Sequence, residues 1–177
     1  LRKVGDPNEL AVQYYSQGID EIVFMDIVAS LYGRNNLYHI IEKATDDVFV
    51  PITVGGGIRT VKDIQRALNA GADKVAINTE AIKHPEFIKE ASNMYGSQCI
   101  IGSIEAKRKG DKWEAYVDNG REKTGIDAVE WAERLVQLGI GEILLTSIDH
   151  EGTKIGFDSD LIKKILRAVS VPVIASG

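Results

Sequence analysis

Short apolar runs recur along the chain, and segments with helical spacing separate them. Most of the runs are continuous rather than alternating, which is typical of strands buried on both faces of a parallel sheet. The predicted strands are 21–27, 50–54, 74–78, 99–105, 142–147 and 171–175.

The polar residues between these runs mark the starts and ends of helices. Asp6, followed by proline, predicts a helix N-terminus with Glu9 in the capping-box position. Thr60 predicts the cap of a helix over 61–69, which Gly71 would stop. Further helices are expected at 34–45, 85–94, 126–138 and 158–168. Strands that alternate with helices predict a parallel α/β sheet.

One segment breaks this alternation. Lys112–Val117 alternates polar and apolar residues, and Asp118–Gly120 supplies the residues of a tight turn. We therefore expect a small hairpin inserted after the strand at 99–107. It is either a surface excursion or a flap over a site at the carboxyl end of that strand.

The chain also contains an internal repeat. Ala11–Ile27 aligns with Ala132–Ile148, a shift of 121 positions. The same shift superimposes Val50-Pro51 on Val171-Pro172, Asp6 on Asp127 and Gly56 on Gly177. Two such units would make roughly 240 residues, close to the roughly 250 of a closed (β/α)₈ barrel.

The repeat predicts a (β/α)₈ TIM barrel of the half-barrel duplication type. Within it, the 99–107 strand and the 74–78 strand lack counterparts in the printed sequence. We therefore expect residues 1–177 to form a single barrel domain that is incomplete at both ends, a partial chain with strands two to seven of eight.

Composition narrows the function classes. The 177 residues are 44% hydrophobic with a net charge of −5, which argues against a disordered chain and against nucleic acid as the main partner. No apolar run approaches the roughly 20 residues of a membrane span. The single cysteine, Cys99, fits a reducing cytoplasm. The three histidines lack ligand spacing, so we do not expect a metal site. We also expect no cofactor.

Candidate chemistry lies where the predicted strands end, because the active site of such a barrel lies at the carboxyl ends of its strands. One set of anion-binding residues comprises Gly56 and Gly57, with Asn78 and Thr79 on the next strand. The alternative for the glycines is a tight turn. A second set comprises Gly152-Thr153 and Ser176-Gly177, and Thr146 is a further candidate for binding phosphate or substrate. Two anion sites suggest a ligand with a phosphate at each end.

Two carboxylates are expected at the same end of the barrel. Glu105 follows an apolar strand, and we interpret it as a general acid or base rather than a solvated surface group. Asp26 is expected to support the site through hydrogen bonds. At the opposite end, Glu21, Lys74 and Glu142 begin their strands and form either a salt-bridge plug or a gate.

Together these residues resemble the cyclase subunit of imidazole glycerol phosphate synthase, a family of histidine biosynthesis. Its half-barrel duplication agrees with the 121-residue shift. The stretches that carry the likeness are Gly5–Pro7, Phe24–Ile27, Thr53–Ile58, Gly71–Val75, Ile77–Thr79, Gly96–Gln98, Gly141–Ile148, Asp149–Lys154 and Ile174–Gly177.

The resemblance implies a lyase that works with a glutaminase subunit. The glutaminase would dock at the N-terminal face and deliver ammonia through the barrel. There a bis-phosphorylated formimino ribotide would be converted to imidazole glycerol phosphate and an aminoimidazole carboxamide ribotide. By similarity Gly57, Asn78 and Thr79 hold one phosphate, and Glu151, Gly152 and Gly177 belong to the other side. Glu21, Lys74 and Glu142 match the gate, and Asp73 matches a partner contact.

Two positions depart from the family. Glu105 stands where the family has a catalytic aspartate, and Glu151 also replaces an aspartate. With glutamate at both positions, the chain resembles a paralogous branch of the family. That branch channels ammonia for the synthesis of acetamidino sugars in bacterial surface polysaccharides. A third reading is a non-catalytic barrel that serves only as a scaffold and conduit for its partner.

Overall fold

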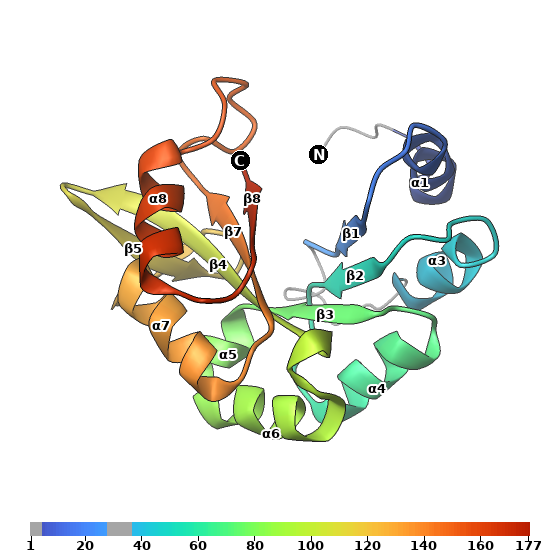
Figure 1. Cartoon of the computed structure of the whole chain (residues 1–177), viewed down its shortest axis with the longest axis horizontal. Helices are drawn as coiled ribbons and strands as arrows, with labels where there is room; N and C mark the ends of the chain where they lie inside the picture. Colours follow the sequence, from blue (N-terminus) through green and yellow to red (C-terminus); the bar gives the residue numbers. More distant parts are fainter. Residues whose placement is uncertain (1–4, 28–36) are drawn as a thin grey trace. The chain divides into compact units, whose positions relative to one another are not determined.

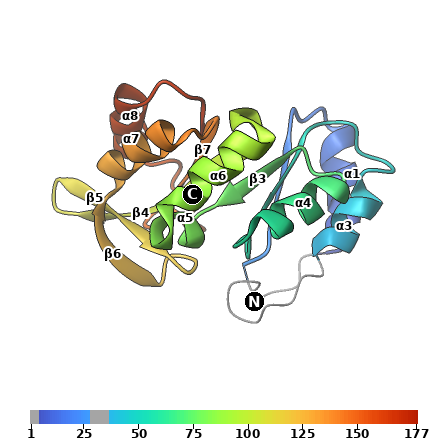
Figure 2. The same ribbon diagram turned by 90° about the horizontal axis from the view of Figure 1, so that it is seen from below.

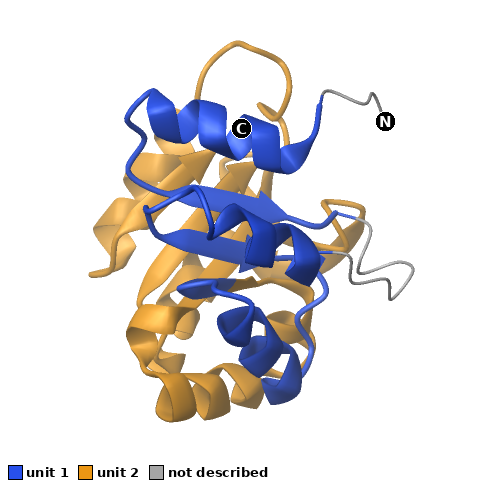
Figure 3. Cartoon of the chain, turned by 90° about the vertical axis from the view of Figure 1, so that its right-hand side faces the viewer, with its two compact units in different colours: residues 1–75 blue, residues 76–177 orange. Residues whose placement is uncertain are grey.

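The computed structural model describes residues 5–27 and 37–177. The chain divides into two compact units, Leu1–Val75 and Ala76–Gly177, coloured separately in Figure 3. Strand β3 (Lys74–Ile77) contributes residues to both units.

The first unit contains two parallel strands and three helices. The elements are α1 (Pro7–Ser16), β1 (Ile22–Met25), α3 (Leu37–Ala44), β2 (Ile52–Gly55) and α4 (Val61–Asn69) (Figure 1). Strands β1 and β2 pair in parallel from Ile22–Ile52 to Met25–Gly55. Apolar residues of α1, β1 and the α3–β2 connection form a buried cluster around Ala11, Ile22 and Val48.

The predicted caps of this unit are confirmed. The Asp6 carboxylate accepts hydrogen bonds from the backbone N–H groups of Asn8 and Glu9 at the start of α1. Thr60 and Asp63 form a reciprocal capping box at the start of α4. The expected helix at 34–45 corresponds to α3, although residues 34–36 lie outside the described residues.

The second unit is larger and contains a parallel sheet with an antiparallel extension. Its elements after β3 are α5 (Thr79–Lys83), α6 (Pro85–Tyr95), the 3₁₀ helix η1 (Ser97–Cys99), β4 (Ile100–Lys109), β5 (Lys112–Val117), β6 (Glu122–Asp127), α7 (Ala128–Leu138), β7 (Glu142–Ser147), α8 (Ser159–Ala168) and β8 (Val173–Ser176). Strands β4, β7 and β8 pair in parallel. Figure 2 shows α7 and α8 side by side on one face of them.

The repeat is preserved in the geometry of the strands. Ile22 pairs with Ile52 in the first unit, and Ile143 pairs with Val173, each 121 positions later, in the second. Asp6 and Asp127 both cap helices by accepting hydrogen bonds from two backbone N–H groups. The predicted parallel α/β class is confirmed, and so are all six predicted strands, whose observed ends lie within four residues of the predicted ones.

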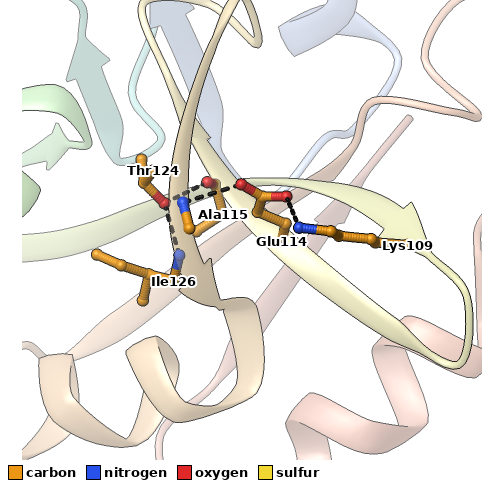
Figure 4. Close-up of polar contacts among 6 residues, drawn as sticks. Lys109, Glu114, Ala115, Thr124 and Ile126 are labelled. Carbon is orange, nitrogen blue, oxygen red and sulfur yellow. Dashed lines mark hydrogen bonds and ion pairs between the residues drawn. The ribbon is translucent and has the colours of Figure 1, made fainter.

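The predicted hairpin is confirmed and is larger than expected. Strand β4 continues to Lys109 and pairs antiparallel with β5, which pairs antiparallel with β6. Figure 4 shows how the β5–β6 bulge is closed: the Glu114 carboxylate accepts from Lys109 Nζ (3.1 Å) and from the Gly125 N–H (2.8 Å). Thr124 Oγ1 donates to the Ala115 carbonyl (2.6 Å). Because residues 126 and 127 belong to β6 or cap the helix, α7 begins at Ala128 rather than at 126.

Candidate active site

Three predicted site residues lie side by side in the second unit. Glu105 of β4 pairs with Thr146 of β7, and Thr146 pairs with Ser176 of β8. Residues paired in register on neighbouring strands present their side chains on the same face of the sheet. All three are partly exposed, whereas Ile104 and Leu145, one residue earlier, are almost fully buried. One face of the sheet, near where the parallel pairing of β4 with β7 ends, therefore presents one carboxylate and two hydroxyls.

The Glu105 carboxylate is held by two donors. Oε2 accepts hydrogen bonds from Asn78 Nδ2 (2.9 Å) and from the Gly120 N–H (2.8 Å). Burial raises the pKa of Glu105, and the nearby charges of Asp118 and Glu151 raise it further, against the lowering effect of the two hydrogen bonds. A raised pKa makes the ionised carboxylate a stronger base than an ordinary one, which suits the group to proton transfer.

Asn78 lies between β3 and α5, and Thr79 begins α5; the two residues contact the end of β5 and the turn after it. Asn78 Nδ2 also donates to the Tyr116 carbonyl (3.1 Å), while Asn78 Oδ1 is buried and has no hydrogen-bond partner. The Asp118 N–H donates to Thr79 Oγ1 (3.2 Å). These contacts agree with the flap interpretation of the hairpin, whose Asp118–Gly120 turn the sequence had not placed among the site residues.

The connection after β7 brings together residues of the second anion-binding set. The N–H groups of His150 (3.1 Å) and Glu151 (2.9 Å) both donate to the Ser147 carbonyl. Gly177 has φ +114°, and a Cβ there would lie 2.8 Å from the same carbonyl and 3.4 Å from the Glu151 nitrogen. Gly152 is exposed, with open space around it.

The hairpin fastens both ends of this β7–α8 connection. The Arg108 N–H donates to Asp149 Oδ2 (2.7 Å), and Trp113 Nε1 donates to Asp158 Oδ2 (3.0 Å). The buried Asp158 also caps α8 by accepting from the Leu161 N–H. Sequence reasoning did not find this arrangement, because Trp113 and Asp158 lie 45 positions apart and no local pattern links them.

In the first unit, close packing of the backbone accounts for the predicted glycine at position 56. Gly56 has φ +94°, and a Cβ there would lie 2.2 Å from the Asp26 carbonyl oxygen. Gly57 also has a positive φ, of +70°. The Asp26 N–H donates to the Gly55 carbonyl (2.9 Å). This close approach supports the tight-turn reading, and anion binding by Gly56 and Gly57 stays a prediction.

Two of the three predicted gate residues are in contact. Lys74 Nζ lies 3.0 Å from Glu21 Oε2, and Thr53 Oγ1 donates to Glu21 Oε1 (2.5 Å). Glu142 belongs to the second unit, at the start of β7.

Asp73, the predicted partner contact, has a structural role in the first unit. Its Oδ2 accepts from the Ile52 N–H and its own N–H donates to the Ile52 carbonyl, both at 2.8 Å. The side chain thus fixes the start of β2.

The described residues contain neither a cluster of metal-binding side chains nor a membrane-spanning helix. Over 5–27 and 37–177, no group of three or more His, Cys, Asp or Glu side chains could hold a metal ion. No helix within those ranges is long and apolar enough to cross a membrane.

Comparison with known proteins identifies the family. The profile of the histidine biosynthesis protein family matches residues 1–177. The chain is 58% identical over 178 residues to the imidazole glycerol phosphate synthase subunit HisF of Legionella pneumophila, covering 100% of this chain and 84% of that protein. The resemblance drawn from the motifs is thereby confirmed. The chain belongs to the histidine biosynthesis protein family.

Proposed function

We propose that this protein is the cyclase subunit of imidazole glycerol phosphate synthase. The observation that carries the proposal is the position of Glu105, a carboxylate with a raised pKa, which is aligned with Thr146 and Ser176 on one face of β4, β7 and β8. The naming of the Legionella pneumophila relative supports the same reaction.

In the proposed reaction, ammonia converts the bis-phosphorylated formimino ribotide to imidazole glycerol phosphate and an aminoimidazole carboxamide ribotide. Forming a carbon–nitrogen bond to ammonia leaves a proton to be removed, and releasing a nitrogen leaving group requires a proton. Glu105 is placed to act as this acid and base. The hydroxyls of Thr146 and Ser176 are hydrogen-bonding groups on the same face, suited to a polar substrate.

The two phosphates would bind at separate places. Gly57 and Thr79 are proposed for one of them, and the connection after β7, with Glu151 and Gly152, together with Gly177 for the other. In the second group, Glu151 and Gly177 meet at the Ser147 carbonyl. Ammonia would come from a glutaminase subunit at the N-terminal face of the barrel, where Glu21 and Lys74 form their ion pair.

The test is consumption of the ribotide by the full-length protein, with excess ammonium salt at alkaline pH and no glutaminase. Glu105→Gln removes the titrating group at nearly constant size and should abolish turnover, a loss of about 100-fold or more. Glu130→Gln, on the exposed face of α7, is the matched control and should retain full activity. Strong activity that survives Glu105→Gln would remove Glu105 from the mechanism.

A second candidate follows from glutamate at positions 105 and 151, where the resembling family has aspartate. In this alternative the barrel channels ammonia for acetamidino-sugar synthesis. Glutamate carries its carboxylate about 1.5 Å further out than aspartate, and catalytic groups require placement within about 0.5 Å. The wild type would then cyclise the ribotide poorly, and Glu105→Asp would raise the rate. If the barrel only conducts ammonia, the wild type, Glu105→Asp and Glu105→Gln should all be inactive in this assay.

A further inference from the structure

The side-chain amide of Asn78 uses its N–H donors within the protein, so they are not available to a phosphate ligand. One N–H of Nδ2 donates to Glu105 Oε2 (2.9 Å), and Nδ2 also donates to the Tyr116 carbonyl (3.1 Å). An amide nitrogen has two N–H donors, so both are used within the protein. Rotating the amide by 180° would lose both bonds and set Oδ1 against two acceptor oxygens. The orientation of the amide is therefore fixed by its neighbours.

This orientation leaves an acceptor without a partner. Asn78 Oδ1 is buried and receives no hydrogen bond. Buried polar atoms in folded proteins nearly always have a partner, because an unpaired one has lost its hydrogen bonds to water without gaining any in the protein. An orphaned acceptor in a candidate active site therefore points to a ligand that brings the missing donor.

Glu105 has the complementary arrangement. Its Oε2 accepts from both Asn78 and Gly120, whereas none of the described residues donates to Oε1. Asn78 and Glu105 thus each keep one oxygen for a ligand, and each holds the other in place. A phosphate monoester dianion, as in the proposed substrate, brings only acceptor oxygens and cannot satisfy either atom.

We propose that Asn78 is a positioning residue for Glu105, and that its Oδ1 binds an N–H donor of the reacting nitrogen, which arrives as an ammonium ion that Glu105 deprotonates. The assignment of the nitrogen rests on the proposed cyclase function. The positioning of Glu105 rests only on the contacts of the second unit. Phosphate binding near this strand end would then be the task of Thr79, whose hydroxyl proton is not used in accepting from Asp118.

The first arm of the test measures the Glu105 carboxyl directly. Its ¹³C resonance is identified in labelled full-length protein by its loss in Glu105→Gln, and is titrated in the wild type, Asn78→Ala and Asn78→Asp. Removing a donor to the ionised form raises the pKa of Glu105, and the added negative charge of Asn78→Asp raises it further. Asn93→Ala, on the exposed face of α6, should leave the titration unchanged. An unchanged titration in both Asn78 variants would overturn the proposal.

The second arm separates a nitrogen ligand from a phosphate ligand. In Asn78→Ala the KM for ammonium should rise and kcat should fall, each by about tenfold, while the Kd for inorganic phosphate changes less than about twofold. A large loss of phosphate affinity with kcat unchanged would mean that Asn78 binds phosphate instead. Asn78→Asp keeps the size of the side chain and so tests the same point if Asn78→Ala fails to fold.

The two arms also distinguish this inference from the proposed function. If the wild type shows no cyclase turnover and the Glu105 titration still shifts in the Asn78 variants, the cyclase assignment fails and the positioning role stands. If turnover is normal and the titration does not shift, the positioning role fails and the cyclase assignment stands.

Discussion

At Gly56 both the backbone conformation and the available space require glycine. Its φ of +94° is unfavourable for any residue with a Cβ, and the Asp26 carbonyl oxygen occupies the place where that Cβ would be. Gly177 repeats the arrangement 121 positions later against the Ser147 carbonyl. The duplicated glycines thus let the chain pass closely over the end of the preceding strand in each half.

Gly56→Ala should therefore lower the free energy of unfolding by about 3 kcal/mol, the sum of backbone strain and a steric clash. Gly18→Ala is the matched control in the same unit, since Gly18 has φ +83° with nothing within 4 Å of the added carbon. It should cost only about 1 kcal/mol. Urea unfolding of both variants measures the difference, and equal losses would mean that the Asp26 contact carries no energy.

Asp158 shows how one buried carboxylate makes stability depend on pH. Burial raises its pKa, but hydrogen bonds from the Leu161 N–H and Trp113 Nε1 outweigh burial, and the pKa is lowered overall. A carboxyl group with a lowered pKa in the folded state stabilises the protein above its unfolded pKa of about 3.9. That stabilisation is lost as the pH falls through the folded value.

We expect Asp158→Asn to lower the free energy of unfolding by about 1–3 kcal/mol at pH 7, because a charged acceptor is lost. The difference from the wild type should shrink as the pH is lowered towards 3. Asp160→Asn, an exposed change in the first turn of α8, should cost less than about 1 kcal/mol at any of these pH values. A deficit for Asp158→Asn that persists unchanged at pH 3 would contradict the charge-based account.

Among the elements, α4 is the helix whose start depends most clearly on its cap. Thr60 Oγ1 accepts from the Asp63 N–H (3.2 Å), and Asp63 Oδ2 accepts from the Thr60 N–H (2.9 Å). The helix begins shortly after the glycine turn that follows β2. The cap of α4 therefore helps to fix the backbone at the end of that glycine turn.

Thr60→Ala should cost about 1 kcal/mol of unfolding free energy, since a backbone N–H of α4 loses its acceptor. Thr60→Ser keeps the hydroxyl and should recover most of the loss. The two variants are compared by urea denaturation followed by far-ultraviolet circular dichroism. A serine variant no more stable than the alanine variant would show that the cap contributes little here.

At the scale of the whole molecule, the proposed function assigns the delivery of ammonia to the starts of the strands and the reaction to their other ends. Lys74 begins β3 and Asn78 follows it, a separation of about 13 Å at about 3.3 Å per residue. A residue that far from the proposed chemistry should act on the delivery of ammonia, not on its reaction.

Lys74→Ala should therefore reduce glutamine-dependent turnover by about tenfold in the complex with the glutaminase, and leave ammonia-dependent turnover within about twofold of wild type. Lys62→Ala, on the exposed face of α4, is the control for loss of a lysine. Equal losses with both nitrogen sources would show that Lys74, with its partner Glu21, only stabilises the fold.

The sequence by itself determined the features that depend on neighbouring residues. The six strands, the caps at Asp6 and Thr60, and the turn at Asp118–Gly120 each follow from periodicity or from hydrogen bonds within a few positions. The repeat aligned the segments that contain β1 and β2 with those that contain β7 and β8, and the two pairs of strands have equivalent registers. Strand β6 and the short helix α5 were missed: β6 is polar with an internal glycine, and five residues are too few for α5 to show periodicity.

Only the tertiary structure decided which side chains face one another across long stretches of chain. Glu105 meets Asn78 over 27 positions and Gly120 over 15, and Trp113 meets Asp158 over 45. These pairs depend on the register of β4 with its neighbours and on the turn of the hairpin, neither of which leaves a local pattern. The sequence could therefore predict Glu105 and Asn78 as separate site residues. Their mutual hydrogen bond, and the unpaired Asn78 Oδ1 that it leaves, arise only when distant parts of the chain are brought together.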